Sequence, residues 1–123
     1  WNPTRTKAMQ VINKMNEVLQ EIIPDRIGRW NDDYEPRAFG DNVQEWGSSL
    51  ILLESGGYPA DPEKQYIRKL NFIAILAGLY SIAQNSYEST TLSQYEQIPR
   101  NDKYLFDFKI TDLENETINN YEK

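Results

Sequence analysis

The first part of the chain carries one apolar stripe at helical spacing. Apolar residues recur three and four positions apart, and charged residues fall between them. Thr4 or Thr6 can cap the start of a helix, and Pro24 ends it because the residue before a proline is driven away from helical angles. The pattern predicts a helix from about residue 4 to residue 23. Its apolar face comprises Ala8, Val11, Ile12, Met15, Val18, Leu19 and Ile22.

A second long helix is predicted from the triplet Asp61–Glu63 to about Ala83. The triplet offers an Asp cap, a proline at the first helical position and an acid in the first turn. From Leu70 to Ile82 this segment is apolar on nearly all sides, which is typical of a helix buried against something large. The run is shorter than the ~20 residues of a membrane-spanning helix. Small residues that allow close approach are Ala74, Ala77 and Gly78.

Between and after these helices the pattern predicts strands. Ser48–Glu54 contains four consecutive aliphatic residues, as in a strand buried on both faces of a sheet. Tyr104–Ile110 alternates like a half-buried strand, and Ile27–Trp30 is a short candidate. A short helix is predicted from Asp41, which would be its cap, to Trp46, and Gly47 would end it.

The order of these elements predicts an α/β fold. Two core strands are too few to cover two strongly apolar helices. The chain is therefore interpreted as a fragment of a domain whose sheet has more strands. We expect residues 1–86 to form part of one α/β domain. Residues 87–123 would then supply a linker, a strand and a polar tail, and could begin an accessory β region. Trp1 is interpreted as an internal boundary of a longer polypeptide.

The composition of the chain excludes several kinds of partner and catalytic site. A net charge of −6 argues against a nucleic-acid partner, which needs a basic surface. The chain has no cysteine and no histidine, which excludes disulfides, Cys or His metal ligands and Ser-His-Asp triads within it. Any catalysis must rest on carboxylates, Tyr, Lys or Arg, or be shared with residues elsewhere.

Glu54 is the candidate catalytic residue. It ends the predicted buried strand and is followed by Gly56 and Gly57, and in α/β folds ligands bind beyond the carboxyl ends of strands. The simpler interpretation is a solvated glutamate or one paired with an arginine. The functional interpretation is a general base or acid, because a partly desolvated carboxylate transfers protons well near neutral pH. The two glycines would allow a tight turn or a close ligand.

Tyr34 and Arg37 are the candidate substrate-binding residues. An arginine can grip a carboxylate with two hydrogen bonds, and a loop tyrosine can swing in as a donor. The same cluster is equally typical of a plain surface loop. Asp32 and Asp33 are adjacent acids, but no calcium-loop spacing follows them, so no metal site is predicted in this chain.

Three blocks carry a family resemblance: Pro36–Asn42, Glu54–Gly57 and Asp61–Phe72. Here the chain resembles the second half of a zinc carboxypeptidase, and is most similar to the carboxypeptidase A-like peptidases of Bacteroidetes-type bacteria. The resemblance extends from about residue 4 to residue 110 and implies a mixed sheet between helices. It also implies a zinc ion held by two His and one Glu, which would lie upstream of Trp1.

By this resemblance, Glu54 is the general base for a zinc-activated water. Tyr34 caps the substrate's C-terminal residue, and Arg37 is a candidate for its carboxylate. The partner would be a peptide, with no nucleic acid and no membrane, in a secreted or periplasmic protein. The fragment alone would be inactive, would hold no zinc, and would self-associate through exposed apolar surface. Two alternatives stay open, a metal-free binding module of the same fold and an independent α/β interaction domain.

Overall fold

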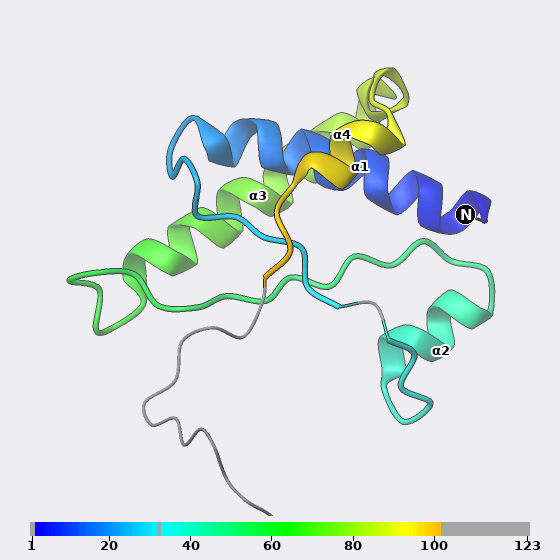
Figure 1. Ribbon diagram of the computed structural model, residues 1–123, viewed down its shortest axis with the longest axis horizontal. Coiled ribbons are helices and arrows are strands. Elements are labelled where there is room, and N and C mark those ends of the chain that lie inside the picture. Colours follow the sequence, from blue (N-terminus) through cyan, green and yellow to red (C-terminus); the bar gives the residue numbers. More distant parts are fainter. Residues whose placement is uncertain (1, 32, 102–123) are drawn as a thin grey trace, which may run out of the picture.

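A computed structural model describes residues 2–31 and 33–101, and its centre is a pair of helices. The first and third helices lie side by side and run antiparallel, as Figure 1 shows. The described helices are α1 (Pro3–Gln20), α2 (Phe39–Glu45), α3 (Gln65–Ala83), the 3-10 helix η1 (Ser86–Ser89) and α4 (Leu92–Gln97).

Helix α1 confirms the first predicted helix and shows how the local sequence begins it. Pro3 occupies the first turn, where its missing N–H costs no hydrogen bond. Asn2, and not Thr4 or Thr6, is the cap, and its side-chain Oδ1 accepts from the backbone N–H of Arg5 at 2.9 Å. The helix ends at Gln20, a few residues before Pro24.

Helix α3 confirms the second predicted helix, although it begins later than predicted. The triplet Asp61–Glu63 forms a turn, and Lys64 adopts a left-handed φ of 59° before the helix begins at Gln65. Asp61 still serves this helix end, because its carboxylate accepts from the backbone N–H groups of Tyr66 (3.1 Å) and Ile67 (2.9 Å).

The core lies where small residues of α3 let it approach α1. A Cβ added at Gly78 would lie 3.3 Å from Met15 Sδ and 3.5 Å from Val11 Cγ1, so the absent side chain is what allows this contact. Ala74 is 1% exposed in the same cluster. The predicted close approach at Ala74 and Gly78 is confirmed. The buried cluster consists of Val11, Met15, Ala74 and Tyr87.

The segment after α3 folds back onto α1. Gln10 Nε2 donates to Thr90 O at 3.1 Å, and Thr90 Oγ1 donates to Gln10 O at 3.2 Å. Asn13 Nδ2 donates to Thr91 O at 2.9 Å. Thr91 then begins α4 through a capping box with Gln94. Polar bonds therefore hold η1 and α4 on the helix pair.

The α/β fold class is wrong for the described residues, which are helical and contain no sheet. The predicted strand Ser48–Glu54 is extended, yet no backbone-to-backbone hydrogen bond joins residues 49–55 to another described residue. The predicted strand Ile27–Trp30 forms a single parallel bridge, from Arg29 to Arg100. The mixed carboxypeptidase-like sheet is therefore absent from the part that the structure describes. The strand predicted at Tyr104–Ile110 lies outside the described residues.

The physical reason for this error is visible in the aliphatic run itself. Ile51 packs against the helical core, while Leu52 is 61% exposed. The run is therefore covered on one side by helices and open on the other, and no described strand pairs with it. A hydrophobic run indicates that a segment can be buried, but it does not supply a neighbouring strand.

The short helix predicted at Asp41–Trp46 is observed as α2, shifted toward the N-terminus by two residues or fewer. Gly47 ends it with a φ of +97°, a left-handed conformation that glycine adopts without a steric penalty. The predicted helix end at Gly47 is therefore confirmed. Helix α2 contains no buried residue, and it lies apart from the helix pair in Figure 1.

Candidate functional site

Glu54 lies on the wall of an open groove of about 870 Å³ between the helix pair and the extended segment. The Glu54 residue is exposed to solvent, so the desolvation expected from a buried strand end is not present in this conformation. The groove combines this carboxylate with an apolar lining. Among its lining residues are Met9, Ile12, Ile51, Leu70, Ala74 and Ile98.

Two polar contacts fix the chain just after Glu54. Ser55 Oγ donates to Asn71 Oδ1 at 2.9 Å, which joins the extended segment to α3. Lys64 Nζ donates to Gly56 O at 3.0 Å. A Cβ added at Gly56 would meet nothing within 4 Å, so the pair Gly56 and Gly57 makes no tight backbone contact here. The groove remains open beside these glycines.

Two arginines on the groove wall are stacked on aromatic rings. The guanidinium carbon of Arg26 lies 5.3 Å from the ring centroid of Tyr58. Arg29 lies at the same distance from Tyr95, and its Nε donates to Ile98 O at 2.8 Å. The groove thus places positive charge near an apolar lining, on fixed side chains.

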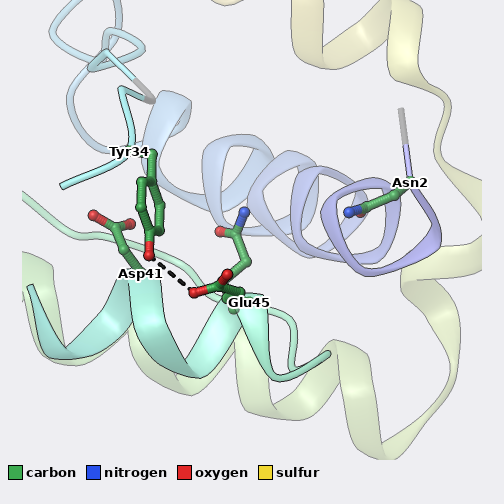
Figure 2. A pocket seen from close by; sticks show the side chains of 5 residues that line it. Asn2, Tyr34, Asp41 and Glu45 are labelled. Carbon is green, nitrogen blue, oxygen red and sulfur yellow. Dashed lines mark hydrogen bonds between the residues drawn. The ribbon is translucent and has the colours of Figure 1, made fainter. Parts of the chain in front are cut away.

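Tyr34 lines a smaller hollow of about 330 Å³, drawn in Figure 2. Its hydroxyl donates to Glu45 Oε2 at 2.9 Å. This hydrogen bond to a carboxylate raises the pKa of Tyr34, and desolvation and the nearby charges of Glu45 and Asp41 add to the effect. Tyr34 is therefore held as a hydrogen-bond donor to Glu45 of α2.

Arg37 is engaged by its own loop. Its Nε and Nη2 donate to the two carboxylate oxygens of Glu35 at 2.9 Å and 3.0 Å, and its backbone N–H donates to Glu35 at 3.0 Å. These bonds, from the side chain first and the backbone second, lower the pKa of Glu35. The Arg37 side chain is 88% exposed, and it lines neither the groove nor the hollow.

The structure brings two of the three candidates into neighbouring hollows. Asp41 and Gln44 line both the groove with Glu54 and the hollow with Tyr34, so the two spaces adjoin. Arg37 is not brought to either. The three candidates therefore do not form one cluster in this conformation.

Sequence reasoning missed Glu45 as the partner of Tyr34, and missed a second contact that shapes this loop. Asp41, predicted as a helix cap, instead accepts from the backbone N–H of Glu35 at 2.9 Å and closes the loop. Glu45 stands eleven positions after Tyr34 across an irregular loop, and no periodic signal connects such residues.

Within residues 2–31 and 33–101, no group of three or more His, Cys, Asp or Glu side chains could hold a metal ion. Helix α3 is long and apolar enough to cross a membrane by length and composition, a property that the core helices of soluble proteins can share. No protein-family model, curated protein or solved structure matches this chain.

Proposed function

We propose that this chain is part of a hydrolase that acts on peptide C-termini and that Glu54 is its general base. The observation that supports the proposal most is the position of Glu54, whose carboxylate lies on the wall of a groove with a largely apolar lining. A groove of about 870 Å³ is large enough for the last residues of a peptide. The resemblance at Glu54–Gly57 and Asp61–Phe72 supports the same role.

In this proposal Glu54 accepts a proton from a water molecule as that water attacks the scissile carbonyl. The same carboxyl group then gives the proton to the leaving amine, so the base is restored at the end of the cycle. The apolar groove lining takes the side chain of the released residue. Tyr34 and Arg37 would contact the substrate after exchanging their present partners, Glu45 and Glu35.

The residues of this chain do not fit a zinc site. The sequence contains no histidine and no cysteine, and the described acids form no ligand group. The proposal therefore assigns the metal ligands to other parts of the complete polypeptide, upstream of Trp1. What this chain contributes is the carboxylate and the groove beside it.

The test is Glu54→Gln in the complete polypeptide that contains these residues. Release of C-terminal residues from a peptide should slow by about 10²–10⁴-fold, because a positioned base contributes about that much. Zinc content and helical content should not change. The matched control is Glu63→Gln, an exposed glutamate in the turn before α3, which should keep normal turnover. Normal turnover of Glu54→Gln would contradict the assignment.

A metal-free binding or interaction module is the second candidate. The observation that favours it is the broad exposed apolar face of α3 (Phe72, Leu79 and Tyr80 are each more than half exposed), which is typical of a surface that binds another protein. Measurements on one protein sample distinguish the two candidate functions. A complete polypeptide that purifies without zinc and releases no C-terminal residue from peptides supports the module and contradicts the hydrolase.

A further inference from the structure

One face of α3 is apolar and uncovered in the part of the molecule that the structure describes. We name it the outer face, and its six side chains are between 50% and 66% exposed. At 100° per residue, the outer face lies opposite the stripe of α3 that packs on α1. The outer face comprises Phe72, Ile75, Leu76, Leu79, Tyr80 and Ile82.

The outer face is large enough for a dimer. Aromatic side chains bury about 150–250 Å² each, so six large side chains that are half exposed offer on the order of 100 Å² apiece. Two copies would together bury roughly 1,200 Å², which is at the lower limit for specific protein–protein interfaces. A patch of about 600 Å² per copy is at the upper end of what monomers expose, and patches of that size often have a function.

The charges around the outer face point to a second copy in antiparallel orientation. By helical rotation, Arg68 and Lys69 lie at its N-terminal end, and neither is ion-paired with a described residue. At the other end, the last turn of α3 leaves backbone carbonyl groups at the negative end of the helix dipole. Antiparallel pairing keeps the two basic ends apart and places each beside the negative helix end of the partner.

A bilayer fits these observations less well. The opposite side of α3 is committed to α1 through Ala74 and Gly78, so the helix cannot enter lipid on all sides without leaving its core. The chain is also acidic overall, with a net charge of −6, which disfavours anionic lipid surfaces.

We propose that two copies of this chain associate through the outer faces of α3, antiparallel, with Leu76 near the two-fold axis. A two-fold axis makes the interface self-complementary, so the same residues serve on both sides. The inference is independent of the proposed hydrolase function, since it uses neither Glu54 nor the groove.

The experiment is sedimentation equilibrium of the 123-residue chain at micromolar concentration. The chain should be a dimer. Leu76→Glu should weaken association by about 30-fold or more, because it places two charges at the centre of the interface. The control is Leu52→Glu, which changes a leucine of similar exposure outside the outer face, and this variant should remain dimeric. Circular dichroism checks that both variants keep their helices.

The orientation is tested by reversing charges. Arg68→Glu should weaken an antiparallel dimer, because it places an acidic side chain beside the negative helix end of the partner. In a parallel dimer the same change would relieve repulsion between the two basic ends, so a stronger dimer would contradict the antiparallel orientation. A monomer at all concentrations, or a dimer that Leu76→Glu leaves unchanged, would overturn the proposal. Co-flotation of the chain with phosphatidylcholine vesicles that Leu76→Glu abolishes would also overturn it, in favour of lipid as the occupant.

Discussion

The helix pair and the segment 21–64 contain similar kinds of residues but bury them very differently. In the helix pair, Val11 is 3% exposed and Ala74 is 1% exposed. In the segment, Phe39 is 80% exposed and Trp46 is 75% exposed. Hydrophobic residues become a core where two elements present matching stripes to each other. The segment has one short helix, α2, and otherwise extended chain and turns in its described residues. Its Ile23 is buried, and its Ile51 packs against the core of the pair.

The largest expected effect that tests this contrast is in the helix pair. Met15→Ala should lower the free energy of unfolding by about 3 kcal/mol, because it empties space between α1 and Gly78 of α3. Urea denaturation followed by circular dichroism measures it. A loss below about 1 kcal/mol would mean that the pair is not the main source of stability, and the contrast with the segment would fail.

A smaller effect is expected at the junction between the two regions, where Asp61 holds the start of α3. Partial desolvation raises the pKa of Asp61, but the backbone N–H groups of Ile67, Tyr66 and Gln65, and then the charge of Lys64, lower it below its ordinary value of 3.8. A carboxyl group with a lowered folded-state pKa stabilises the fold above its unfolded pKa. That stabilisation is lost as pH falls through the folded value.

The first turn of α3 should therefore loosen below pH 3.8. The start of α1 should not, because the capping amide of Asn2 does not titrate. Amide NMR signals of Ile67 and Arg5, followed from pH 6 to pH 2, compare the two helix starts within one molecule. Asp61→Asn should remove the pH dependence at Ile67. Equal loosening at both starts would show general acid unfolding instead.

The smallest effect is expected within the segment. Phe39→Ser removes a large side chain that is 80% exposed, so the free energy of unfolding should change by about 0.5 kcal/mol or less. The same urea titration measures it. A loss comparable to that of Met15→Ala would show that the segment packs in solution against something that the described residues do not include.

The sequence predicted what depends on local periodicity. The stripe with Val11 and Met15 located α1, and the small residues Ala74 and Gly78 marked where α3 contacts it. The Gly47 stop was also correct, since a left-handed residue is a local requirement. These features follow from spacing and backbone sterics, which need no knowledge of the rest of the fold.

The errors arose where the answer depends on distant partners. Four aliphatic residues before Glu54 are compatible with a buried strand, but strand pairing needs a neighbour that the sequence pattern does not supply. The contacts of Tyr34 with Glu45 and of Arg37 with Glu35 are set by a loop path, so they were not predicted. Glu54 was expected to be partly desolvated because it was assigned to the end of a buried strand. No described strand pairs with the segment before it, and Glu54 is exposed.

The antiparallel arrangement of α1 and α3 has a consequence for the length of the chain between them. The end of α1 and the start of α3 lie at the same end of the pair, so the segment 21–64 leaves and returns at one place (Figure 1). The entropic cost of closing such a loop grows only with the logarithm of its length, about 0.6 kcal/mol for each doubling. The helix pair can therefore accept insertions or deletions in this segment with little loss of stability.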